Sequence, residues 1–89
     1  MTLRPILASH ARIKIDSHSG DPILLFPEGL LILNSTAYEI ARRCTGEVTV
    51  GEMLRLLAEE FEAEEEIVRN DLFEHLEQLQ RKNLLLFLA

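Results

Sequence analysis

The spacing of hydrophobic residues along the chain changes from a period of two to a period of three to four. Residues 11–16 alternate apolar and polar side chains, which is typical of a strand with one buried face. The apolar runs 22–26 and 30–33 are short and follow turn residues, which predicts two further strands. Pro27-Glu28-Gly29 predicts a tight turn between them. Short connections favour an antiparallel meander over about residues 11–33.

The second part of the chain has the periodicity of amphipathic helices. Asn34 or Ser35 can cap a first helix, and Thr49-x-x-Glu52 is a capping box that opens a second. A third helix begins in an acidic run that suits the amino end of a helix dipole. Its apolar stripe consists of Val68, Leu72, Leu76 and Leu79. The pattern predicts three helices over about residues 35–83.

These elements predict an α+β fold of the order βββααα, in which a three-stranded antiparallel sheet packs on three helices. A small sheet beside three helices gives a winged-helix-like outline. The length of 89 residues fits a single domain spanning residues 1–89. The apolar C-terminal tail, residues 84–88, is too short for a helix and is expected to form a strand or to dock on the domain.

The charge distribution disfavours nucleic acid as a partner. The chain has 15 acidic and nine basic residues, for a net charge of −6. The predicted third helix, from Glu64 to Gln80, carries Arg69 as its one base against six acids. Phosphates would be repelled by that helix, so a DNA-reading helix-turn-helix is not expected. An acidic winged-helix protein that acts in regulation or dimerisation remains an alternative.

Few residues suggest catalysis or metal binding. His10, His18 and His75 have no metal-ligand spacing with one another or with Cys44. Cys44 ends the apolar stripe of the first helix and is expected to be a small core residue. The four glycines lie at or near turns and helix starts, so there is no phosphate-binding loop. We therefore expect no enzyme activity, no catalytic residues, no metal and no cofactor.

The sequence also predicts a cytoplasmic protein without a membrane segment. A single cysteine cannot form an internal disulfide. No apolar run approaches the roughly 20 residues that a transmembrane helix needs.

One segment carries a family resemblance. Residues 25–37 read Leu-Phe-Pro-Glu-Gly-Leu-Leu-Ile-Leu-Asn-Ser-Thr-Ala, and they resemble the PqqD family, whose members carry Leu-x-Pro-Glu-Gly followed by Leu-Asn-x-Thr-Ala. The likeness covers roughly residues 5–86. It implies a recognition element for ribosomally made, modified peptides. In pyrroloquinoline quinone biosynthesis such a domain binds a short precursor peptide and presents it to a radical S-adenosylmethionine enzyme, without catalysis of its own.

The resemblance also implies where the peptide binds. In the family the peptide lies along the third strand, in the groove between that strand and the third helix. Carried over to this chain, the peptide-binding residues are Leu30, Leu31, Ile32, Leu33, Arg69, Leu72, Phe73 and Leu76. Phe73 falls off the core stripe of its helix, which a partner groove would explain. A lone surface aromatic or a wider core is the alternative explanation.

Two features depart from the family pattern. Ile32 stands where many relatives have a basic or polar residue, and residues 83–89 are unusually apolar. Both leave open a homodimer or strand pairing by the tail. The peptide itself stays open too, because PqqD-like domains serve several modified-peptide pathways.

Overall fold

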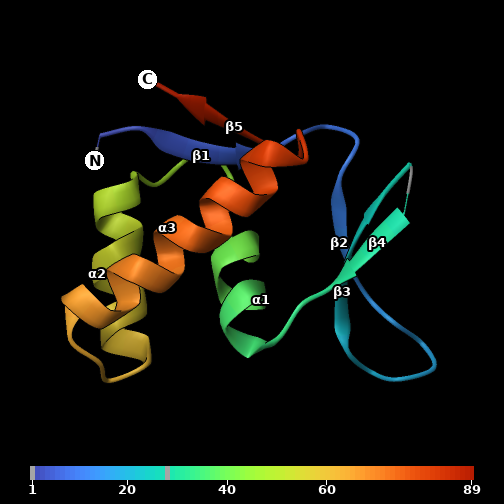
Figure 1. Cartoon of the computed structure of the whole chain (residues 1–89), viewed down its shortest axis with the longest axis horizontal. Helices are drawn as coiled ribbons and strands as arrows, with labels where there is room; N and C mark the ends of the chain where they lie inside the picture. The colour runs from blue at the N-terminus through green and yellow to red at the C-terminus, as the bar shows by residue number, and fades with distance from the viewer. Residues whose placement is uncertain (1, 28) are drawn as a thin grey trace.

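The computed structural model describes residues 2–27 and 29–89, and it confirms the predicted α+β class with three helices and a three-stranded antiparallel sheet (Figure 1). The elements in chain order are β1 Arg4–Leu7, β2 Arg12–Ile15, β3 Pro22–Phe26, β4 Gly29–Ile32, α1 Ser35–Arg42, α2 Val50–Glu60, α3 Glu65–Arg81 and β5 Leu85–Leu88. The predicted order βββααα is therefore extended by one strand at each end.

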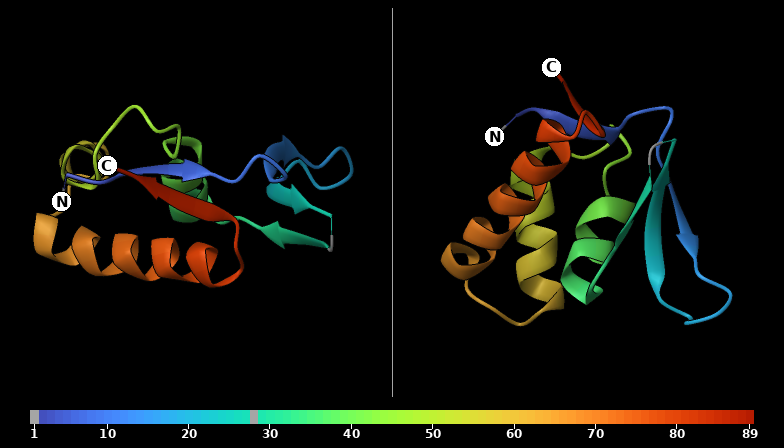
Figure 2. Two further views of the ribbon diagram at one scale, coloured as in Figure 1. Left: turned by 90° about the horizontal axis from the view of Figure 1, so that it is seen from above. Right: turned by 45° about the vertical axis from the view of Figure 1, so that its right-hand side comes forward.

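The three-stranded sheet is the predicted meander, with strand order β2-β3-β4. Lys14 pairs with Ile23 and Ile23 with Ile32, so β3 is central and β2 and β4 are edge strands. The helices lie to one side of this sheet (Figure 2, right). Of the predicted turn Pro27-Glu28-Gly29, Glu28 lies outside the described residues.

The structure also contains a two-stranded sheet, which the sequence did not predict. β1 pairs antiparallel with β5, and Arg4 is the partner of Leu88. The apolar tail thus forms a strand, as one of the two predicted outcomes, and its partner is in the same chain. β1 escaped prediction because four residues that include Pro5 show no alternation. Its other edge is bonded to the loop after α1, where Gly46 N–H donates to the Pro5 carbonyl at 2.9 Å.

The helices α1 and α2 begin at the caps that the sequence predicts. The Ala37 N–H donates to the side chain of Asn34 at 2.8 Å, and both bonds of the Thr49–Glu52 capping box are present. Among residues 2–27 and 29–89, no helix has the length and hydropathy needed to cross a bilayer.

The core lies between the sheet and the apolar faces of the helices. Cys44 is buried in it, as predicted. The most deeply buried side chains are Pro5, Leu24, Ile40, Met53, Leu54, Leu57, Leu72 and Leu84. They come from both sheets and all three helices, so the core fixes α1 and α3 relative to the edge strand β4.

Candidate functional site

The edge strand β4 presents backbone groups that have no partner in the sheet. The Leu33 N–H donates to the Pro22 carbonyl at 3.0 Å, which makes Pro22 and Leu33 a hydrogen-bonded pair of the β3–β4 ladder. Hydrogen-bonded and non-hydrogen-bonded pairs alternate in an antiparallel ladder. The N–H and C=O groups of Leu30 and Ile32 therefore point away from β3, toward the open edge.

The side chains of the same strand alternate between the two faces of the sheet. Leu31 and Leu33 face the helices and pack on the core. Leu30 and Ile32 face outward and are 50% and 74% exposed. The apolar run Leu30–Leu33 is therefore not buried on both faces of the sheet, because the side chains of Leu30 and Ile32 stay exposed.

A groove of about 140 Å³ adjoins this edge, between β4, α1 and α3. Its lining residues are Leu31, Ile32, Leu33, Asn34, Ala37, Ile40, Ala41, His75, Gln78 and Leu79. Ile40, Ala41 and Leu79 are buried and make its apolar floor. His75 and Gln78 of α3 add hydrogen-bonding groups, so the groove can hold an apolar side chain next to polar ones.

The four predicted peptide-binding residues of α3 do not line this groove. Leu72 is completely buried in the core. Arg69 is exposed next to Glu66 and Asn70, elsewhere on the helix. Phe73 and Leu76 line a different hollow. None of the four lines the β4 groove.

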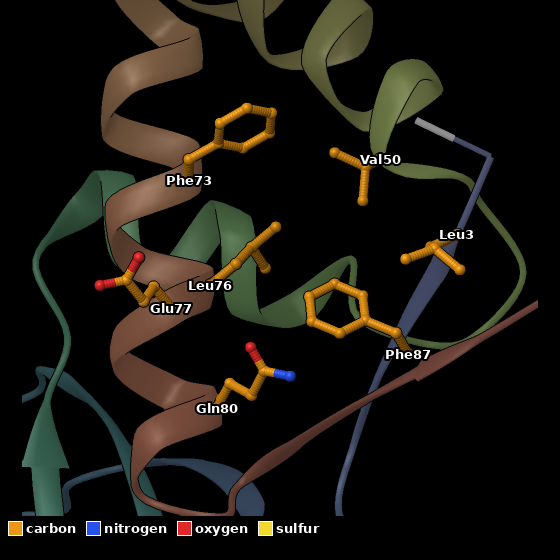
Figure 3. A pocket seen from close by; sticks show the side chains of 7 residues that line it. All are labelled: Leu3, Val50, Phe73, Leu76, Glu77, Gln80 and Phe87. Carbon is orange, nitrogen blue, oxygen red and sulfur yellow. The ribbon is translucent and has the colours of Figure 1, made fainter.

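That hollow has a volume of about 360 Å³ and lies between α3, the start of α2 and the β1–β5 sheet. Figure 3 shows its lining residues, which are Leu3, Val50, Phe73, Leu76, Glu77, Gln80 and Phe87. It is larger and more apolar than the β4 groove. The exposed ring of Phe73 is thus explained by a hollow, although on the other side of α3.

The hollow also borders an open strand edge. The Ala8 N–H donates to the Leu84 carbonyl at 2.8 Å, so by alternation the backbone groups of Leu85 and Phe87 point away from β1. The β4 groove differs in offering His75 and Gln78 beside its edge, which allows selection of polar side chains.

The groove residues of α3 that sequence reasoning missed are His75, Gln78 and Leu79. Leu79 belongs to the predicted core stripe. Helical periodicity separates inside from outside, but it does not say which flank of the helix meets the sheet. The stripe alone could therefore not distinguish Phe73 on one flank from His75 and Gln78 on the other.

An ion-pair network holds α1, which carries part of the groove floor, against α2. Arg43 bonds both Glu39 of α1 and Glu60 of α2, and Arg42 bonds Glu39 as well. Burial acts to raise the pKa of Glu39, but hydrogen bonds from Arg43 and Arg42 outweigh it and hold that pKa below its ordinary value. Glu39 therefore stays charged at neutral pH and keeps both arginines in place.

The site offers binding groups and no activated nucleophile. Burial raises the pKa of the Cys44 thiol to about 12, so it stays protonated at neutral pH. Its thiol donates to the Ile40 carbonyl oxygen, with 3.3 Å between Sγ and that oxygen, and is buried in the core. What remains at the site is a row of unpaired backbone groups beside an apolar groove.

Fold and site together define a class of protein: a small α+β domain that presents an open strand edge next to a helix, the arrangement that binds extended peptides by adding a strand. The chain belongs to the PqqD family, since the family model described as coenzyme PQQ synthesis protein D (PqqD) matches residues 23–85, more than half of its length.

Relatives support the same assignment. A PqqA binding protein of Bradyrhizobium diazoefficiens is 33% identical over 92% of this chain and 80% of its own length. Another, from Xanthomonas campestris pv. campestris, is 31% identical over 91% of this chain and 88% of its own. The fold matches the solution structure of the PqqD part of Methylobacterium extorquens PqqCD, with a TM-score of 0.78 and 26% identity over 92% of this chain and 87% of that one. That protein is described as a functional, stand-alone recognition element for ribosomally synthesised and modified peptides.

Proposed function

We propose that this chain is a non-catalytic peptide-binding protein of pyrroloquinoline quinone biosynthesis. It binds the PqqA precursor peptide as an additional strand on β4 and presents it to a separate radical S-adenosylmethionine enzyme. The observation that carries the proposal is the outward direction of the Leu30 and Ile32 backbone groups beside the groove of His75, Gln78 and Leu79.

Strand addition alone gives modest affinity. Leu30 and Ile32 offer four backbone groups, and each hydrogen bond contributes about 0.5–1.5 kcal/mol net. Their sum, roughly 2–6 kcal/mol, falls short of the ~8 kcal/mol of a micromolar complex. Side chains of the peptide must supply the rest. The apolar floor at Ile40, Ala41 and Leu79 can take one apolar side chain, which sets the register of the peptide along β4.

Delivery to another protein follows from the chemistry of the site. The groove binds and orients a peptide, while the one thiol of the chain is protonated and buried. Chemistry on the peptide then needs a second protein. A peptide held along β4 leaves its far edge open, so the partner enzyme can reach it from that side.

Calorimetric titration with PqqA of the same organism tests the groove. Gln78→Ala removes a hydrogen-bonding group from the wall and is expected to weaken binding about three- to tenfold. Phe73→Ala is the matched control on the same helix, because Phe73 is exposed at the other hollow, and it should keep the affinity within about twofold. A loss with Phe73→Ala and none with Gln78→Ala would move the site to the β5 side.

Titration with duplex DNA at low salt tests the alternative of a regulatory winged-helix protein. Since the chain carries a net charge of −6, no saturable binding is expected. Tight, saturable binding of DNA would contradict the proposed function.

A further inference from the structure

The outer face of the three-stranded sheet carries two parallel rows of side chains. Residues paired across an antiparallel sheet project from the same face. The first row is Arg12, Leu25 and Leu30, and the second is Lys14, Ile23 and Ile32. Each row therefore begins with a base on β2 and continues through two apolar residues to the open edge at β4.

This face is basic in an otherwise acidic protein. Arg12 and Lys14 are the only charged residues in β2, β3 and β4, and both are exposed. Within residues 2–27 and 29–89, neither has an acidic partner within 4.0 Å. The hydroxyl of Ser19 is the main cause that holds the pKa of Asp16 below its ordinary value, and Lys14 contributes least. Among the residues that the structure describes, the positive charge of the face thus has no ion-pair partner.

The apolar part of the face is open at β4, where Leu30 and Ile32 are exposed, whereas Leu25 is half-buried and Ile23 is buried. Figure 2 (right) shows that the helices lie on one side of the sheet. Ile13, Leu24 and Leu31, which alternate with the two rows along the strands, pack on the core. Leu30 and Ile32 are among the most exposed large apolar side chains of the described residues. Two unpaired bases beside two exposed apolar side chains form a surface suited to a partner with carboxylates next to apolar groups.

We propose that the outer face of β2–β4 is a docking surface for a protein whose contact region pairs acidic and apolar side chains. A second copy packed face to face does not fit this chemistry, because the residues of the two rows include no acid and so bring no carboxylate to Arg12 and Lys14. An anionic membrane is disfavoured by the net charge of −6, which repels it outside this face.

The position of the face links it to peptide delivery, and this link rests on the proposed function. A strand added at β4 extends both rows, so every second side chain of the peptide projects from the same outer face. A protein docked there contacts this chain and every second side chain of the bound peptide. It can therefore bind the peptide-bound chain and the free chain with different affinities.

The test uses the full chain and the radical S-adenosylmethionine protein of the same pathway as probe. Arg12→Glu/Lys14→Glu should weaken binding of that protein at least tenfold and leave PqqA affinity within about twofold. Arg12→Ser/Lys14→Ser should give an intermediate loss. Arg55→Glu/Lys82→Glu, which reverses two exposed bases outside the sheet, is the matched control and should bind within about threefold of wild type. Amide spectra of every variant establish that each is folded.

Unchanged binding by folded Arg12→Glu/Lys14→Glu would overturn the proposal, as would an equal loss in the Arg55→Glu/Lys82→Glu control. Binding of wild type to phosphatidylglycerol vesicles with the same dependence on Arg12 and Lys14 would overturn it in favour of a membrane. The two proposals fail separately. If PqqA does not bind at all, the proposed function fails, while the docking result is still read from the charge-reversal variants.

Discussion

Replacing Ile32 by proline separates the peptide-binding role of β4 from its role in the fold. The Ile32 N–H points to the open edge, so its removal costs no bond of the β3–β4 ladder. Its side chain is 74% exposed and contributes little burial. Proline is tolerated on an edge strand where the lost N–H faces outward, so the free energy of unfolding should change by less than about 1 kcal/mol.

The effect on peptide binding should be much larger. Without the N–H, a carbonyl of the bound peptide is buried at the edge without a donor, which costs about 1–3 kcal/mol. Since ~1.4 kcal/mol is a factor of ten, the Kd for PqqA should rise about 5- to 150-fold. Ile32→Ala keeps the N–H and controls for the side chain. Calorimetric titration gives the affinities, and urea unfolding gives the stabilities.

Leu31→Pro is the matched proline control on the same strand. By alternation the Leu31 N–H bonds to Leu24 of β3, so this variant should lose about 1–3 kcal/mol of stability through an unpaired carbonyl. If Ile32→Pro is folded and binds PqqA like wild type, the peptide does not pair with β4. A large stability loss in Ile32→Pro together with none in Leu31→Pro would show that the Ile32 N–H, and not the Leu31 N–H, bonds to β3.

Four further predictions concern stability and reactivity. Gly46→Ala places a Cβ at φ +82° and 3.0 Å from Leu88, so it should lower the free energy of unfolding by about 1–2 kcal/mol or more, measured in urea. Thr49→Ala removes a helix cap and should cost about 0.5–2 kcal/mol in the same assay. Hydrogen bonds from Thr49 lower the pKa of Glu52 in the folded state, so the Glu52 carboxylate stabilises the fold above its unfolded-state pKa. This stabilisation is lost as the pH falls through the lowered pKa. Glu52→Gln should therefore make the free energy of unfolding depend less on pH in the acid range. Cys44 should resist alkylation at pH 7 in the folded protein and react in urea; rapid labelling without urea would contradict its burial.

The meander and the helix starts could be predicted because their signals are local. Alternation at Arg12–Ile15 and the caps at Asn34 and Thr49 each involve a few neighbouring residues. β1 and its pairing with β5 could not be predicted in this way, since partners such as Arg4 and Leu88 are 84 positions apart. Such a contact is fixed by the packing of the whole chain.

The predicted peptide-binding residues stay a prediction, and the structure places their strand part and their α3 part differently. Leu30 and Ile32 lie on an edge strand, and the register shows that these two residues direct their backbone outward. On α3 the sequence indicated an apolar stripe, but the flank that faces β4 depends on the angle at which the helix crosses the sheet. Only the structure reveals that His75 and Gln78, rather than Phe73, lie beside β4.

The central claim is that the peptide adds to β4, and one measurement tests it most directly. Amide spectra of the labelled chain are recorded during titration with PqqA of the same organism. The account predicts the largest shifts at residues 30–34 and 75–79, with protection of the Leu30 and Ile32 amides from exchange. Shifts concentrated instead at residues 85–88 and around Phe73 would place the peptide on the β5 edge and contradict the account.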